Sequence, residues 1–207
     1  MENGIRKLES REDFKKVYQV FTEEPYNEEY TDEELDEIYD EYMEKGFMYG
    51  AYINGECSGL IAIERGVKKD QPVNYDENST AYLADVAVLR KFRNTGLGTQ
   101  LMIYGVMAAK EQGFKTMYMR TLEKGKSMSY GIAERLGFSQ VPNTYQIVDR
   151  ERTVEDMDTK AVNIFLDIDL ENLDREKIKA TMDIAKKGIA RKLSREAKKD
   201  EKGNTER

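Results

Sequence analysis

DVAVLRKFRNTGLGT, at residues 85–99, is the stretch from which the rest of this sequence can be interpreted. It reads as the end of a β-strand, then a basic loop, then two glycines that open an apolar helical pattern. A strand that delivers unpaired backbone N–H groups to the start of a helix forms a cradle for anions. Gly96 and Gly98 carry no Cβ atom, so a ligand can approach the main chain closely. The stretch therefore predicts an anion site, to which its basic side chains add positive charge.

The composition indicates one domain with a proper core and an appended segment. The chain has 207 residues, of which 39% are hydrophobic and 35% are charged. It contains no apolar run of about 18 residues, the length that a membrane-spanning helix needs. Its first residues lack the apolar centre of a signal peptide. We therefore expect a cytoplasmic location and no membrane partner.

Two residue types that often carry catalysis are scarce. The sequence has no histidine and a single cysteine, Cys57. The absence of histidine removes the Ser-His-Asp and Cys-His hydrolases and the commonest transition-metal ligand. One cysteine excludes an internal disulfide and a thiolate metal cluster. We therefore expect no metal site, and a buried structural role for Cys57.

Charge is unevenly distributed along the chain. The net charge is −7, which disfavours nucleic acid as a partner. Residues 23–44 hold twelve acidic residues and no basic ones, whereas residues 186–199 hold seven basic residues and one glutamate. An acidic segment attracts cationic small molecules.

The strand and helix patterns follow one another in the order β-α-α-β-β-β-α-β-α-β-β. Thr31, followed three residues later by Glu34, forms a capping box that predicts a helix start. Asn54-Gly55 between two β-rich runs predicts a tight hairpin. The expected strands are residues 4–8, 47–53, 57–65, 80–88, 115–122, 138–148 and 161–170, and the expected helices are residues 11–22, 31–45, 96–112 and 127–136.

Residues 171–207 form a separate C-terminal segment after a domain at residues 1–170. Apolar residues recur there at helical spacing and predict an amphipathic helix: they are Ile178, Met182, Ala185, Ile189 and Leu193. Docking on the domain is the simplest role for this helix. A homodimer contact and a basic helix for nucleic acid or membranes are the alternatives. The last nine residues are expected to be frayed.

Arg93, Gly96 and Gly98 resemble the R-x-x-G-x-G loop of the GNAT acyltransferase superfamily. Leu136-Gly137-Phe138 resembles the L-G-F that ends a helix in that family. The order of elements is similar over about residues 4–170. The resemblance implies a mixed α/β (α+β) fold, with a mostly antiparallel sheet flanked by helices. It also implies acetyl-CoA as co-substrate and acetyl transfer to a primary amine, by direct attack in a ternary complex.

The resemblance also implies which residues bind the coenzyme. The segment that matches the diphosphate loop is expected to use its backbone N–H groups, and the strand before it is expected to bond the pantetheine arm. A serine at a small-residue position of the family joins them. The expected coenzyme-binding residues are Val86, Ala87, Val88, Arg93, Asn94, Thr95, Gly96, Leu97, Gly98, Thr99 and Ser129.

The acid and base of the reaction are less clearly marked, because the family's usual positions hold Ala84 and Ala133 here. Asp85 is one candidate base acting through water, although alternation along a strand predicts that it points away from the face of Ala84. Glu64 on the preceding strand is another. Tyr130, one turn before Ala133, is a candidate acid; packing is its simpler role.

The acceptor is expected at the acidic segment 23–34, where carboxylates with interspersed tyrosines suit a cationic small molecule or a lysine side chain. A solvated acidic helix face is the simpler interpretation of this charge run. Two other functions stay open: an acyl-CoA sensor or interaction module with weak catalysis, and a toxin that acetylates aminoacyl-tRNA. The acidic balance argues against the second.

Overall fold

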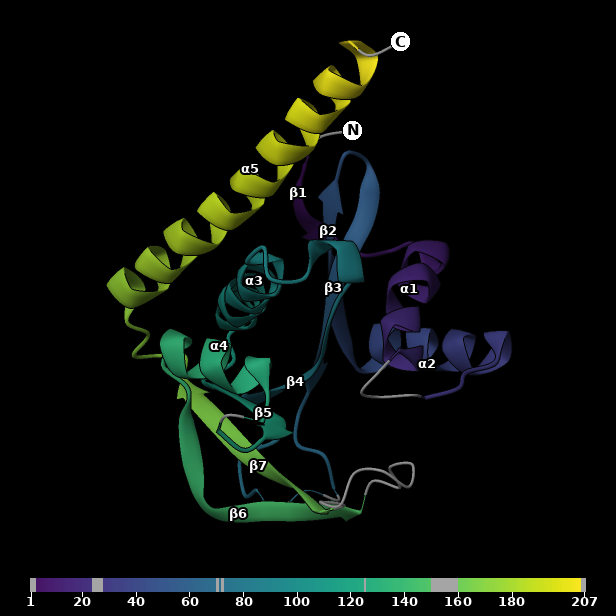
Figure 1. Ribbon diagram of the computed structural model, residues 1–207. Coiled ribbons are helices and arrows are strands. Elements are labelled where there is room, and N and C mark those ends of the chain that lie inside the picture. The colour runs from purple at the N-terminus through teal and green to yellow at the C-terminus, as the bar shows by residue number, and fades with distance from the viewer. Residues whose placement is uncertain are drawn as a thin grey trace.

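The structure is a computed structural model that describes residues 3–23, 28–69, 71, 73–124, 126–149 and 160–205; the side chains of residues 146–149, 160–162 and 196–205 are not described. Within these ranges the chain forms an open sheet with helices on both faces (Figure 1). The order of elements is the one that the sequence predicts. The expected mixed α/β class with a mostly antiparallel sheet is confirmed.

The described sheet has seven strands in the order β1-β2-β3-β4-β5-β7-β6. All neighbouring pairs are antiparallel except β4 and β5, which are parallel. The strands are β1 (Gly4–Lys7), β2 (Gly46–Ile53), β3 (Glu56–Arg65), β4 (Thr80–Val88), β5 (Thr116–Leu122), β6 (Ser139–Asp149) and β7 (Lys160–Asp169).

The helices divide between the two faces of the sheet. One face is covered by α1 (Arg11–Tyr18), the short 3-10 helix η1 (Gln19–Thr22) and α2 (Asp32–Lys45). The other face is covered by α3 (Leu97–Glu111) and α4 (Met128–Leu136). Each layer buries its own apolar cluster against the strands, so the sheet is supported on both faces.

Two local signals in the sequence produce the structures that they predict. The Thr31 hydroxyl accepts the Glu34 N–H and the Glu34 carboxylate accepts the Thr31 N–H, which completes the capping box of α2. Asn54 and Gly55 both have positive φ angles, 53° and 82°, at the turn between β2 and β3. Those angles match the twist of a tight hairpin and favour this residue pair.

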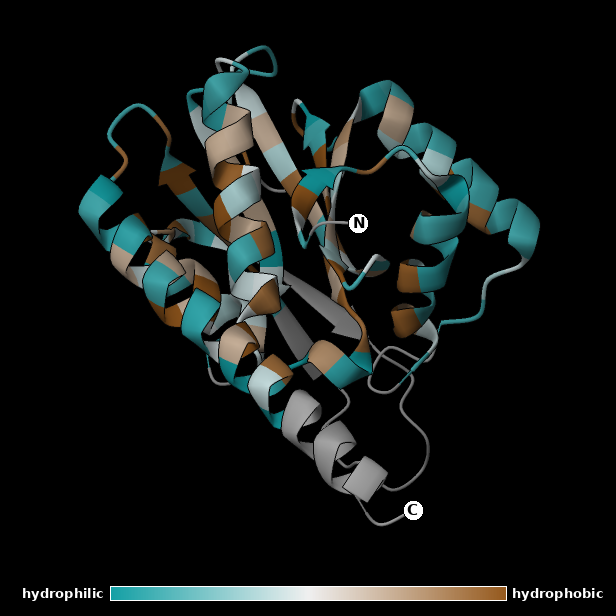
Figure 2. Cartoon of the chain, turned by 90° about the horizontal axis from the view of Figure 1, so that it is seen from above, coloured by the Kyte–Doolittle hydropathy of each residue, from teal (hydrophilic) through white to brown (hydrophobic). Residues whose placement is uncertain are grey.

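The C-terminal segment forms one long helix, α5 (Arg175–Thr205). It packs on α3 and α4, outside the helical layer of that face (Figure 1). Its apolar stripe is therefore used within the chain, and the helix extends into the nine residues expected to be frayed. In Figure 2, α5 is the helix that leads to the C mark, and hydrophilic and hydrophobic segments alternate along it. Among the described residues, no helix has the length and apolarity needed to cross a membrane.

Candidate active site

The centre of the sheet opens where β4 leaves β5. The two strands pair only from Thr80 to Leu83 of β4, against Thr116 to Met119 of β5. β4 continues to Val88, still paired with β3 but no longer with β5. The predicted pantetheine-binding residues Val86, Ala87 and Val88 all lie in this divergent part. Main-chain groups on that edge of β4 are therefore placed to bond an extended ligand, as in the addition of a strand.

A β-bulge in β4 corrects the expected orientation of Asp85. Ala62 of β3 pairs with Asp85, and the next residue, Ile63, pairs with Leu83, so Ala84 is the extra residue. A bulge of one residue breaks the alternation of side chains along the strand. Ala84 packs against the cluster of α1 and α2, and Asp85 bonds to tyrosines of the same cluster. The expectation that Asp85 faces away from Ala84 was wrong, because the sequence carries no sign of the bulge.

Two tyrosines hold the carboxylate of Asp85. The Tyr18 hydroxyl of α1 donates to Asp85 Oδ2 at 2.9 Å, and the Tyr42 hydroxyl of α2 donates to the same oxygen. Burial raises the pKa of Asp85 above its usual range, against the opposing effect of these two donors. Burial, together with the Asp85 charge, also raises the pKa values of Tyr18 and Tyr42. Both hydroxyls therefore stay protonated at neutral pH, beside a carboxylate that takes up protons more readily than an ordinary aspartate.

The bend that follows β4, residues 89–96, leads into α3, whose start has no side-chain cap. Gly96 is the N-cap of α3 in the left-handed conformation, with φ 90°, and no described side chain caps the helix. The N–H groups of Leu97, Gly98 and Thr99 therefore have no acceptor within α3. A Cβ atom on Gly98 would meet only Val88 Cγ2, at 3.6 Å. The main chain at Gly98 is thus open to an anion.

Side chains brace this bend from within. Arg93 Nε donates to the Val88 carbonyl at 3.2 Å, and its guanidinium pairs with Glu23 at 3.0 Å. The buried Thr95 hydroxyl donates to the Phe92 carbonyl. Asn94 is exposed, with φ 61°. The charge of Arg93 is shared with a carboxylate, so the remaining donors of the bend are its backbone amides and the exposed side chains of Arg90 and Asn94.

A small hydroxyl cluster joins the end of β5 to the start of α4. Ser129, predicted from its sequence position, bonds Thr121 of β5 at 2.7 Å and also Ser127, the N-cap of α4. Thr121 could not be predicted from the sequence, because its partners Ser127 and Ser129 are separated from it by a loop. The ring of Tyr130, on the same helix, packs against the main core cluster, and the Lys124 ammonium lies 5.8 Å from the ring centroid.

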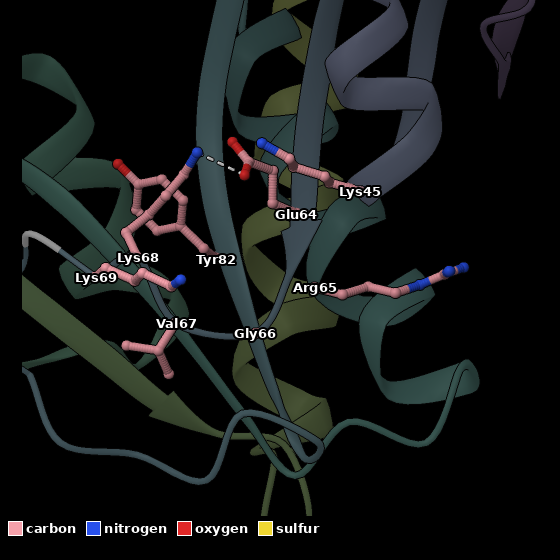
Figure 3. A pocket seen from close by; sticks show the side chains of 8 residues that line it. All are labelled: Lys45, Glu64, Arg65, Gly66, Val67, Lys68, Lys69 and Tyr82. Atoms are coloured by element: carbon pink, nitrogen blue, oxygen red, sulfur yellow. Dashed lines mark ion pairs between the residues drawn. The ribbon is translucent and has the colours of Figure 1, made fainter.

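Glu64 lies on the same face of the sheet as Asp85 but has a different partner. Its carboxylate is buried and pairs with the Lys68 ammonium at 2.6 Å. Glu64 and Lys68 line a cavity of about 490 Å³, which is shown in Figure 3. Arg65, another lining residue, extends away from the Glu64 carboxylate. The other lining residues are Lys45, Gly66, Val67, Lys69 and Tyr82. Two of its basic side chains are already paired, Lys68 with Glu64 and Lys45 with Glu41 at 2.7 Å, so the lining carries little free positive charge.

Several carboxylates of the acidic run at residues 23–44 form ion pairs. Residues 24–27 lie outside the described residues. On α2, Asp36 pairs with Lys15 at 2.9 Å and with Arg11 at 3.2 Å, and Asp40 pairs with Arg11 at 2.6 Å. These pairs tie α2 to α1 on the outer surface. They give Asp36 and Asp40 basic partners, whereas the simpler interpretation of this charge run was a solvated acidic face.

Comparison with known proteins relates this chain to an acetyltransferase family by sequence and to several solved structures by fold. A sequence model described as the acetyltransferase (GNAT) family matches residues 12–138. A search of curated proteins found no match. Among solved structures, an N-acetyltransferase from Staphylococcus aureus Mu50 superposes with a TM-score of 0.63 at 16% identity, covering 82% of this chain and 99% of that one.

Two further structures share the fold. A Bacillus subtilis acetyltransferase in complex with CoA has a TM-score of 0.59 at 18% identity, covering 81% of this chain and 99% of that chain. The ribosomal-protein-S18-alanine N-acetyltransferase of Escherichia coli has a TM-score of 0.59 at 15% identity, covering 84% of this chain and 97% of that chain. At these identities the likeness establishes the fold.

Proposed function

The chain belongs to the acetyltransferase (GNAT) family, whose members use acetyl-CoA, and from this premise we propose that it transfers acetyl to a primary amine by direct attack in a ternary complex. The observation that carries the proposal is the divergence of β4 from β5 beside the uncapped start of α3. It leaves main-chain donors and acceptors for an extended ligand that ends in phosphates.

The residues at this divergence fit coenzyme A. The open main chain at Gly98 and the first-turn N–H groups of α3 would hold the diphosphate. The free edge of β4 from Val86 to Val88 would bond the pantetheine arm, and Ser129 would contact it from α4. A further donor, Gln100 Nε2, is buried one turn after Gly96 and has no hydrogen-bond partner among the described residues. When bound, acetyl-CoA supplies the thioester carbonyl that the amine attacks and the thiolate that leaves.

Asp85 is the proposed base. An amine is protonated at neutral pH and must lose a proton before it can attack. Asp85 stands at the bulge where β4 diverges, with a pKa raised toward the range in which a carboxylate accepts protons usefully. Tyr18 and Tyr42 act as positioning residues, because their hydroxyls fix the orientation of the carboxylate. Glu64, bound to Lys68, and Tyr130, packed on the core, stay predictions as base and acid.

The buried thiol of Cys57 supports direct attack over an acyl-enzyme route. Cys57 is 1% exposed, and burial raises its pKa to about 11. A thiol is nucleophilic only as the thiolate. Cys57 is therefore protonated at neutral pH and shielded from a thioester.

The charged groups on the α1 and α2 side of the sheet bear on the charge of the acceptor. Asp36 and Asp40 of α2 pair with Arg11 and Lys15, and the basic residues that line the neighbouring cavity include Lys45 and Lys68, which pair with Glu41 and Glu64. A cationic small molecule or a lysine therefore has less support than the sequence suggests. Neutral, cationic and anionic amines therefore all belong in the test.

Release of the CoA thiol over a panel of neutral, cationic and anionic amines tests the proposal, with acetyl-CoA binding measured by calorimetry. We expect binding in the absence of amine and turnover with at least one amine class. Binding without turnover of any amine would favour the sensor alternative. Absence of binding to a folded protein would contradict the whole proposal.

A further inference from the structure

The C-terminal helix touches the coenzyme bend through main-chain atoms. A Cβ atom built on Gly188 of α5 would lie 2.2 Å from the Thr95 carbonyl oxygen. One built on Gly96 would lie 2.6 Å from the Ala185 carbonyl oxygen. Such approach is possible only because both positions are glycine. The helix and the bend are therefore fixed against each other at Ala185–Gly188.

The direction of α5 brings its later residues in front of α3. At the far end of α3, the Lys110 ammonium contacts the Leu170 carbonyl, shortly before α5 begins. At the near end, Gly96 lies against Ala185. The helix thus runs back along α3, and the residues after Gly188 pass beyond the end where the free N–H groups of α3 point.

Those later residues are rich in positive charge. The Lys192 ammonium lies 5.4 Å from the ring centroid of Phe92, at the entrance to the bend. Arg191 and Arg195 are exposed. Among the described side chains, no ion pair includes Arg191 or Arg195. In the bend, by contrast, Arg93 pairs with Glu23 and Lys91 pairs with Glu56. In a chain of net charge −7, this end of α5 brings its cations to the bend.

We propose that α5 forms one wall of the nucleotide end of the coenzyme site, where Arg191, Lys192 and Arg195 bind the 3′-phosphate of CoA. The inference rests on the proposed function and adds to it a segment outside the residues that the family model matches. The contact at Gly188 sets the helix close enough to the bend for its cations to reach a ligand held there. Charge-assisted hydrogen bonds to phosphate are the strong class of such contacts.

Calorimetric titration with CoA and with dephospho-CoA, which lacks the 3′-phosphate, tests this assignment. The variant is Arg191→Glu with Arg195→Glu, and the matched control is Lys179→Glu, an exposed position of the same helix near the other end of α3. The wild type should bind CoA more tightly than dephospho-CoA. In the double variant CoA affinity should fall by about tenfold or more, because charged hydrogen bonds are lost and repulsion is added. Its dephospho-CoA affinity should fall much less.

The outcomes separate the inference from the proposed function. Lys179→Glu should bind both ligands within about twofold of the wild type, since a distant surface charge is screened. If the double variant binds CoA like the wild type, or loses both ligands equally, the 3′-phosphate assignment is wrong while coenzyme binding stands. If the folded wild type binds neither ligand, the proposed function fails as well.

Discussion

At the scale of single residues, the raised pKa of Asp85 makes the stability of the fold depend on pH. Its raised pKa means that the folded chain binds this proton more readily than the unfolded chain does. At pH values above both pKa values, the ionised carboxylate therefore lowers the free energy of unfolding, and this cost disappears as the pH falls through the folded pKa. Carboxylates with a pKa perturbed in this way cluster at functional sites, which is why Asp85 is the candidate base.

Asp85→Asn should consequently separate activity from stability. We expect kcat to fall by about 10²–10⁴, the usual worth of a general base, while the melting temperature at pH 7 rises. The acid limb of the pH–rate profile should disappear with the carboxylate. Thiol release across pH and thermal unfolding measure the two effects. Retention of the acid limb by the variant would assign the base to another residue.

Tyr42→Phe should shift the acid limb of the pH–rate profile without removing it. The variant takes one donor from the Asp85 carboxylate, so the pKa of Asp85 rises further. A hydrogen bond to a charged group is worth about 1.5–3 kcal/mol, which corresponds to a shift of about one pH unit or more. The acid limb should therefore move to higher pH.

Tyr39→Phe is the matched control, because the Tyr39 hydroxyl on the same helix donates to the Glu9 carbonyl and not to Asp85. Its pH–rate profile should be that of the wild type. Equal shifts in the two variants would mean that α2 moves as a whole and that Tyr42 has no particular effect on Asp85.

At the scale of elements, local signals predicted most of the structure and failed where distant segments meet. Thr31 and Asn54 act on neighbouring residues, so their effects can be read directly from the sequence. The bonds from Tyr18 and Tyr42 to Asp85 join positions 67 and 43 residues apart. No spacing rule links such positions, and both tyrosines lie on helix faces that read as ordinary core. The bulge at Ala84 was missed for the same reason, since it is set by pairing with β3.

The contact between α5 and the bend predicts that replacing a glycine by alanine lowers the free energy of unfolding in α5 and raises it in α4. Gly188→Ala places a Cβ against the Thr95 carbonyl, and we expect the free energy of unfolding to fall by about 1–3 kcal/mol, as for overpacking. CoA affinity should fall with it. Gly131→Ala on α4 meets only the flexible end of Arg135, at 3.7 Å, so the gain in helix propensity should raise stability by up to about 1 kcal/mol.

Urea denaturation of both variants measures these changes. Loss of stability in Gly188→Ala alone is the expected result. A gain in both would mean that α5 does not hold its place on the bend.

At the scale of the whole molecule, the sequence predicted the C-terminal helix but not its docking site. The stripe from Ile178 to Leu193 indicates only that one face is buried. The packing of that face on α3 and α4 depends on surfaces built by residues far away in the chain. The family match ends at residue 138, so it carries no information on α5. The structure joins the two parts through one apolar cluster, which includes Ile178.

Because Ile178 belongs to that cluster, we predict that α5 and the rest of the domain unfold as one cooperative unit. Ile178 is 7% exposed, and Ile178→Ala should lower the free energy of unfolding by about 2–5 kcal/mol. Ile184 on the same helix is 71% exposed, and Ile184→Ala should change it by less than about 0.5 kcal/mol. Circular dichroism and tyrosine fluorescence should report a single shifted transition for Ile178→Ala. An early loss of helical signal, with the main transition unmoved, would show instead that α5 unfolds independently of the sheet.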